Sequence, residues 1–288
     1  MTEGTKVPIC LFVPVKNEEA NLDRCLQSVS WVDEIFVVDS QSNDRTTKIA
    51  QEHGATVVQF EYMGGWPKKK NWALDNLPFS HQWVLILDAD ECLPPEAEEE
   101  IRNIVSNPIE KHSGYWINRR YFFLEKPLKH AYFPNWNLRL FKHKFGRYEK
   151  VTELNTNSGD NEIHEHVVVK GTTGKLNSIM DHYAFPSIDS FIEKHNRYSN
   201  WEAVVESSAE DDETALQHDG VKGKRRLRKI FRKLPFRPTL RFLYVYFWQK
   251  GILDGWRGYI FARLHAQYEF LSQAKAKAIL AGRKETRD

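Results

Sequence analysis

The sequence predicts an α/β fold in which a mainly parallel sheet is flanked by helices. Over the first hundred residues, runs rich in β-branched and other apolar side chains alternate with helical patterns. Strand–helix–strand units of this kind build parallel sheets through right-handed crossovers. Ligands bind such sheets at the carboxyl ends of the strands, and here these ends are polar or turn-forming. We therefore expect a ligand site at that edge of the sheet.

Four buried strands are predicted in this first part of the chain, over 7–15, 34–38, 55–60 and 82–87. One helix is expected to begin near Glu18, and a second, capped by Asn43 or Asp44, to run to His53. From about 113 to 185 the pattern changes to short aromatic strands, which indicate an α+β extension of the same domain. A further helix is predicted over 188–205.

Composition divides the chain into a catalytic domain over 1–205, an acidic linker over 206–220 and a basic, aromatic, helical tail over 221–288. The net charge is only +2, yet 222–241 holds ten Lys or Arg residues and no acid. A basic amphipathic helix over 224–233 would lie on an anionic membrane surface, with the later aromatic runs at headgroup depth. The alternative is that these helices pack on the catalytic domain or on a second subunit. Nucleic-acid binding is not expected, because no reader motif accompanies the charge.

The cysteines and the apolar segments indicate the compartment. Cys10, Cys25 and Cys92 contain no C-x-x-C pair, which argues against a disulfide framework and favours a reducing environment. No apolar run reaches the 18 to 20 residues or so of a spanning helix, and the N-terminus lacks the features of a signal peptide. We expect a cytoplasmic protein that lies peripherally on the inner face of the cytoplasmic membrane.

The strongest motif is LILDADE at 85–91, where an apolar strand ends in Asp88 and Asp90. Residues two apart in an extended segment point to one side. The two carboxylates can therefore share a divalent cation and the diphosphate that it bridges. The alternative is a pair of helix-capping acids before Pro94, which is the usual interpretation of an isolated D-x-D.

Two other strands also end in polar turns. In VVDSQSNDRT at 37–46, Asp39 can accept a hydrogen bond from a base or a ribose hydroxyl, whereas Asp44 is better placed to cap the next helix. In VPVKNEE at 13–19, the backbone around Pro14 and Val15, with Asn17 or Glu18, would meet a nucleotide beside Asp39. The segment GGWPKKKNWALDN at 64–76 adds cations at a helix start, where phosphate oxygens are well held.

Taken in this order, the segments resemble those of the inverting family 2 glycosyltransferases, which have the GT-A fold. The resemblance covers about residues 7 to 185. Within the family the chain is most similar to the lipopolysaccharide core β-glucosyltransferase subgroup, through VPVKNEE, VVDSQSNDRT, GGWPKKKNWAL, LDADE, LRLF and HEH. It implies that Asp39 contacts the nucleobase, Asp88 the ribose or the metal shell, and Asp90 the metal. It favours Lys70 and Asn71 over Lys68 and Lys69 for the phosphates. Because many GT-A enzymes supply a late histidine to the metal, it also implies His182 as a ligand.

An inverting transfer needs a carboxylate that takes the proton of the attacking acceptor hydroxyl. The resemblance places this general base in NEIHEHVVVKG at 161–171, where Glu165 is the candidate. Glu162, Asp160 and Glu153 remain alternatives. Arg139 could face either the diphosphate or a buried acid.

The implied activity is transfer of a sugar from a nucleotide-sugar donor, UDP-glucose by the subgroup resemblance, to a membrane-associated glycan or glycolipid acceptor. A divalent cation, Mg²⁺ or Mn²⁺, would be the cofactor, held by Asp90 with Asp88 and His182 as further candidates. Three alternatives stay open: a polyprenyl-phosphate glycosyltransferase, a sugar nucleotidyltransferase and a non-catalytic membrane adaptor. The second would need a glycine-rich nucleotide loop, and VPVKNEE contains no glycine.

Overall fold

The structure, a computed structural model, describes residues 5–64, 66–149, 166–207, 234 and 236–285. Its N-terminal part forms four parallel strands, which confirms the predicted ones with small differences at their ends: β1 (Val7–Val15), β2 (Val32–Asp39), β3 (Thr56–Gln59) and β4 (Trp83–Ile86). Helix α1 (Leu22–Gln27) begins after a turn at Glu18. Helix α2 (Thr46–Glu52) has Arg45 at its N-cap position, so the predicted caps Asp44 and Asn43 lie one and two residues too early. The Asp44 carboxylate nevertheless accepts the Thr46 N–H at 3.0 Å.

Strand order determines where a ligand can bind. The order is β3-β2-β1-β4, so the chain moves outward from β1 in one direction through β2 and β3, and β4 then returns to the other side of β1. A crevice opens at such a reversal, outside the carboxyl ends of the two central strands. Here these ends carry the segments 14–18 and 88–90.

The sheet continues beyond β4 in the order β8-β6-β11-β5, with antiparallel pairs at β4/β8, β8/β6 and β11/β5 and a parallel pair at β6/β11. These strands are β8 (Trp136–Lys142), β6 (His112–Phe123), β11 (Thr172–Phe185) and β5 (Glu91–Cys92). The expectation of short strands is wrong for β6 and β11, which have 12 and 14 residues. Both lie inside the sheet, and they pair with each other over most of their length, with breaks in register.

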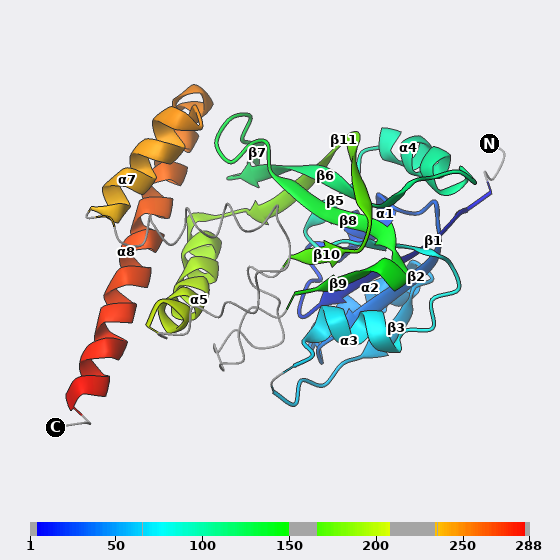
Figure 1. Ribbon diagram of the computed structural model, residues 1–288, viewed down its shortest axis with the longest axis horizontal. Helices are drawn as coiled ribbons and strands as arrows, with labels where there is room; N and C mark the ends of the chain where they lie inside the picture. The colour runs from blue at the N-terminus through cyan, green and yellow to red at the C-terminus, as the bar shows by residue number, and fades with distance from the viewer. Residues whose placement is uncertain (1–4, 65, 150–165, 208–233, 235, 286–288) are drawn as a thin grey trace.

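Helices and a small ribbon cover the two faces of the sheet (Figure 1). One face packs on α1, α2 and α4 (Glu96–Val105), and the other on α3 (Lys69–Asn76) and the ribbon. The ribbon pairs β9 (Gly146–Tyr148) with β10 (Val167–Val169). The short strand β7 (Lys126–Pro127) pairs with β6, and a 3-10 turn, η1 (His143–Phe145), precedes β9. Together these elements form the GT-A arrangement of a curled mixed sheet between helices.

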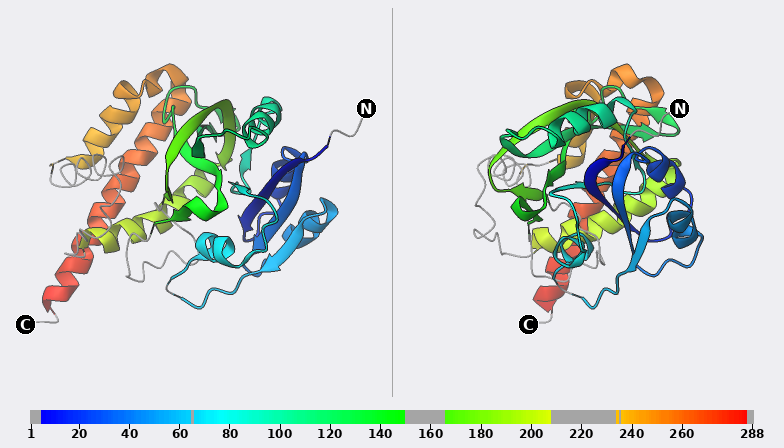
Figure 2. Two further views of the ribbon diagram at one scale, coloured as in Figure 1. Left: turned by 45° about the vertical axis from the view of Figure 1, so that its right-hand side comes forward. Right: turned by 90° about the vertical axis from the view of Figure 1, so that its right-hand side faces the viewer.

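The C-terminal helices pack on the sheet domain (Figures 1 and 2). Helix α5 (Ile188–Ser207) and helix α8 (Gly255–Glu285) lie side by side, and α8 also contacts α7 (Arg237–Leu243). A π-helical turn, η3 (Tyr244–Trp248), and a 3-10 turn, η4 (Gly251–Asp254), connect α7 to α8. Phe261 and Val245 share one buried cluster with Phe123 and Phe185 of the sheet. The described part of the tail therefore packs on the catalytic domain, which was the alternative to a separate membrane-binding tail.

Further expectations concern the linker, the basic helix, membrane-spanning helices and the cysteines. The predicted linker over 206–220 begins inside α5, because Glu206 and Ser207 are still helical, and the rest of it lies outside the described residues. So does the basic helix predicted over 224–233. Among the described helices, none combines the length and apolar character that crossing a bilayer requires. The three cysteines are buried and free of disulfides.

Candidate active site

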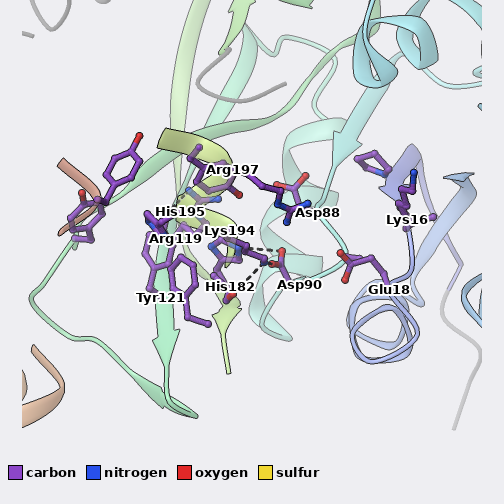
Figure 3. Close-up of a pocket in the computed structure, with 18 of the residues that line it drawn as sticks. Lys16, Glu18, Asp88, Asp90, Arg119, Tyr121, His182, Lys194, His195 and Arg197 are labelled. Carbon is purple, nitrogen blue, oxygen red and sulfur yellow. Dashed lines mark hydrogen bonds and ion pairs between the residues drawn. The ribbon is translucent and has the colours of Figure 1, made fainter. Parts of the chain in front are cut away.

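A cavity of about 630 Å³ opens at the carboxyl ends of β1 and β4, where the strand order predicts a ligand site. Its wall includes the β1 segment from Pro14 to Glu18 and the turn from Asp88 to Asp90. Figure 3 shows Lys16 and Glu18 on one side of Asp90, with Tyr121, His182 and Lys194 on the other.

Sheet register brings His182 to Asp90. Strand β5 follows directly after Asp90 and pairs with β11, where His182 lies opposite Glu91. The Nε2 atom of His182 is 3.2 Å from one carboxylate oxygen of Asp90, and Lys194 of α5 donates to the other at 3.1 Å. Burial would raise the pKa of Asp90, but His182 and Lys194 outweigh it and hold this pKa far below its usual range. Asp90 is therefore a carboxylate at any physiological pH.

The Asp90–His182 pair fits a small divalent cation. Carboxylate oxygen and imidazole nitrogen suit Mn²⁺, and a carboxylate with water and substrate phosphates suits Mg²⁺. The Nδ1 atom of His182 is buried and has no hydrogen-bond partner in the described ranges. In the part of the chain that the structure describes, no three His, Cys, Asp or Glu side chains form a complete metal site. Donor phosphates or water would have to supply the other ligands.

Asp88 is engaged by two cations instead. Lys70 donates to one of its oxygens at 2.8 Å and Arg139 to the other at 2.5 Å. Burial alone would raise the pKa of Asp88, but Arg139 and Lys70 hold it well below its ordinary value. Arg139 also contacts the fully buried Glu91 at 2.5 Å, so the structure places it against buried acids. The other alternative for Arg139, a direct contact with the diphosphate, is not needed to explain where its side chain lies.

The β1 segment forms the opposite side of the cavity. Asn17 has a φ of 55°, and its side-chain oxygen accepts the Asn43 N–H at 3.0 Å, which ties this turn to the loop after β2. Burial, together with repulsion from Asp90, raises the pKa of Glu18. Lys69, which sequence reasoning set aside, also lines the cavity and donates to the Val15 carbonyl at 2.9 Å.

Two predicted nucleotide residues lie outside the described cavity wall. Asp39 is fully buried at the end of β2 and accepts hydrogen bonds from Ser42 and Gln59. Asn71 is buried and exchanges two hydrogen bonds of 2.9 Å with the main chain of Tyr148. The structure thus shows structural contacts for both side chains, and their nucleotide contacts stay predictions.

The predicted general base cannot be placed. Glu165 lies outside the described residues, as do the alternatives Glu153, Asp160 and Glu162. The role of this segment therefore remains a prediction that mutagenesis must test.

Four residues of the predicted tail line the same cavity as the strand-end residues of the domain predicted over 1–205: Arg241, Phe261, His265 and Tyr268. The last three follow an i, i+4, i+7 spacing, which places them on one face of α8. This spacing was visible in the sequence, but nothing local indicates what the face contacts. Lys194, Arg119 and Tyr121 were also missed, since they reach the cavity from elements distant in sequence.

A cavity at the reversal of an α/β sheet, with a D-x-D turn and adjacent cations, fits the GT-A class of fold that the sequence predicts. Comparison with protein families identifies the group more closely. The model of glycosyl transferase family 2 matches residues 10–160, which is more than half of the chain. The chain belongs to glycosyltransferase family 2.

The similarity to individual relatives extends beyond the residues that the family model matches. The chain is 29% identical over 285 residues to the lipopolysaccharide core biosynthesis glycosyltransferase LpsC of Rhizobium meliloti, covering 94% of this chain and 92% of the relative. It is 33% identical over 208 residues to an uncharacterized glycosyltransferase of Rickettsia conorii, covering 70% and 72%. The first 349 residues of TarS from S. aureus align with a TM-score of 0.39 and 13% identity, covering 91% of this chain and 90% of that one. Glucosyl-3-phosphoglycerate synthase from Mycobacterium tuberculosis aligns with a TM-score of 0.31 and 24% identity over 41% and 45%.

Proposed function

We propose that this glycosyltransferase moves a sugar, with inversion, from a nucleotide diphosphate donor to a hydroxyl group of a membrane-associated glycan or glycolipid. The observation that carries the proposal is the meeting of Asp90 and His182, 3.2 Å apart, beside the Asp88–Lys70 pair at the strand ends. UDP-glucose is the donor that the sequence motifs favour. The similarity to a lipopolysaccharide core enzyme over nearly the whole chain supports an envelope glycan as acceptor.

Different residues of the cavity would bind different parts of the donor. Asp90 and His182 would hold Mg²⁺ or Mn²⁺, which when bound neutralises charge on the departing diphosphate. Lys70 lies at the start of α3 and donates to Asp88, and its ammonium group can also turn toward the phosphate oxygens of a donor. Arg139 keeps Asp88 ionised and oriented toward the cavity. Pro14, Val15 and Asn17 would line the nucleotide, with Asp39, Asn71 and Glu18 as its other predicted contacts.

Ligand-dependent unfolding tests the donor. We expect UDP-glucose with Mn²⁺ to raise the unfolding temperature of the full chain by about 5 °C or more at a hundredfold excess over its dissociation constant, because such binding adds about 2.7 kcal/mol. The panel includes UDP-galactose, GDP-mannose and TDP-glucose, each with Mn²⁺ and with EDTA, and Mn²⁺ alone. The proposal fails if no nucleotide sugar stabilises the chain in the presence of the metal.

The tail supports a second part of the proposal, that the enzyme lies on the cytoplasmic membrane at its inner face. Several large apolar side chains of the tail are more than half exposed: Phe236, Phe247, Trp248, Leu253 and Trp256. Single exposed apolar residues are common, but a group that includes two tryptophans is typical of membrane interfaces. The basic block of the sequence leads into this group, and anionic lipid would attract it.

Vesicle binding tests this surface in the intact chain. A truncation at 220 is unsuitable, because it would remove Val245 and Phe261 from the buried core. We instead expect the double variant Trp248→Ser, Trp256→Ser to bind vesicles of phosphatidylcholine and phosphatidylglycerol about tenfold or more weakly than the parent protein. Ile109→Ser, an equally exposed residue on the sheet domain, should bind normally. Equal binding by the double variant, or indifference to phosphatidylglycerol and to salt, would contradict membrane association through the tail.

A further inference from the structure

We infer that the C-terminal helices form a subsite for an anionic group, a phosphate or a carboxylate, carried by the sugar acceptor. The inference rests on the proposed function, because it assigns the second half of the same cavity. It starts from the tail residues that line this cavity, which the sequence alone had assigned to a separate membrane device.

The cavity has two chemically different halves. The acidic residues among its described lining, Glu18, Asp88 and Asp90, belong to the loops after β1 and β4. In the other half the charged residues of the described wall are cations: Lys194, Arg119, Arg197 and Arg241. Figure 3 shows Arg119, Tyr121 and His195 on the side of Asp90 away from Glu18. A donor bound at Asp90 therefore leaves a cationic, aromatic half for the acceptor.

Aromatic rings connect Asp90 to the tail. The Asp90 partner His182 packs on Tyr121, with ring centroids 4.8 Å apart. Tyr121 meets Tyr132 edge-on at 6.1 Å, and Tyr132 stacks on His265 of α8 at 4.5 Å. A wall of this kind suits a sugar, since apolar faces with a few fixed polar groups set the orientation of a ligand.

Arg241 is the cation that stands out in this wall. Its guanidinium contacts the Tyr132 hydroxyl and lies 5.5 Å from the centre of the Tyr132 ring. Within the described ranges no carboxylate forms an ion pair with it, and its Nε atom is buried without a hydrogen-bond partner. Arg237, one helical turn earlier, instead takes both Glu206 and Glu269. An arginine that is half-buried without an ion pair among the described residues is costly, and an anionic ligand would offset that cost.

The neighbours of Arg241 hold it in place without neutralising it. The Tyr132 hydroxyl lies between Arg241 and the Nδ1 atom of His265, at 3.2 Å from the latter. Burial, with repulsion from His195 and Arg241, lowers the pKa of His265 well below its usual value, so this ring is neutral. Tyrosine and neutral histidine carry no negative charge. Glu269 attracts the guanidinium of Arg241 but forms its ion pair with Arg237, so the positive charge of Arg241 is not taken up by an ion pair of its own among the described residues.

The chemistry of arginine indicates the ligand. A guanidinium presents a planar fork of donors that matches phosphate and carboxylate oxygens. Lys70 and the Asp90 site, on the opposite side of the cavity, would bind the diphosphate of the donor. An anion bound at Arg241 would therefore belong to the acceptor, and would place it with a hydroxyl directed toward the donor.

Simple sugars probe this subsite in the full chain. Isothermal titration compares glucose, glucose 6-phosphate and glucuronic acid as ligands, which separates a phosphate from a carboxylate as the recognised group. We expect the parent protein to prefer at least one charged sugar over glucose. Arg241→Gln should bind that sugar about 10-fold to 100-fold more weakly, the value of one charged hydrogen-bonded contact, and should bind glucose unchanged. Arg263→Gln, an exposed arginine of α8 outside this cavity, should behave as the parent.

Further variants keep the test decisive if Arg241→Gln does not fold. Arg241→Lys keeps the charge and should retain part of the preference for the charged sugar. Tyr132→Phe keeps the ring but removes the hydroxyl that holds the guanidinium, so this variant should lose part of the preference. Absence of any preference for a charged sugar, or its full retention in Arg241→Gln, would overturn the subsite. Binding of UDP with Mn²⁺ is titrated separately. If the nucleotide fails to bind while the charge preference persists, the proposed function falls and the anion subsite stands.

Discussion

Asp90→Asn is expected to lower kcat/KM for sugar transfer by about 10³-fold and to abolish the dependence of donor binding on Mn²⁺. The asparagine keeps the size of the side chain but removes the charge that faces His182 and Lys194. A bound metal contributes several kcal/mol to stabilisation of the departing diphosphate, and each 1.36 kcal/mol is a factor of ten in rate. The measurements are steady-state transfer rates and donor binding, each over a titration of Mn²⁺.

A neighbouring carboxylate provides the control for this variant. Asp181 is the residue before His182 on β11, but its side chain pairs with Arg120 at 2.7 Å and lies outside the described cavity wall. Asp181→Asn should therefore keep its metal response. Asp90→Asn should still fold, because the partly exposed Lys194 can turn to solvent, and its circular dichroism spectrum checks this. Full activity of a folded Asp90→Asn protein would remove the metal-site hypothesis.

Glu165→Gln is expected to retain binding of donor and metal but to lose about 10²-fold to 10⁴-fold in transfer to a hydroxyl acceptor, the usual effect of removing a general base. The substitution neutralises the group predicted to take the acceptor proton and leaves the Asp90 site unchanged. Single-turnover transfer rates, measured with donor saturating, isolate this step from binding.

The adjacent acids decide between the candidates. Glu162→Gln, Asp160→Asn and Glu153→Gln should each transfer at close to the parent rate. If one of them shows the loss and Glu165→Gln does not, the assignment moves to that residue while the mechanism stands. If none does, the acceptor is better explained as a phosphate, which needs no strong base, as in a polyprenyl-phosphate glycosyltransferase.

Local patterns in the sequence were enough to predict the parallel half of the sheet and the D-x-D turn. Apolar β-branched runs bounded by turn residues mark each of the four strands, and the Asp44–Thr46 hydrogen bond before α2 depends only on residues two positions apart. The predicted position of Asp88 and Asp90 follows from the same signal, because the fully apolar run of β4 gives way there to polar and turn-forming residues. Family membership was also predictable, since the motifs that carry it are short and contiguous.

Tertiary structure decided which polar side chains face the cavity. Asp39 and Lys70 both lie at positions where a strand ends or a helix starts, yet Asp39 bonds to Ser42 and Gln59 while Lys70 reaches Asp88 in the cavity. The position of a residue in a local pattern does not determine the direction of its side chain. That direction depends on neighbours that arrive from elsewhere in the chain.

The role of the tail was likewise decided by contacts between distant segments. Clustered cations and aromatic residues indicated a membrane surface, and the exposed Trp248 and Trp256 remain compatible with one. The same tail also buries Phe261 against Phe123 and directs Arg241 into the cavity, contacts that join residues more than a hundred positions apart. The sequence by itself determined that α8 has an aromatic face, because helical spacing is a local property. Only the folded chain determined that this face lines the candidate cavity, because burial depends on which surfaces meet in space.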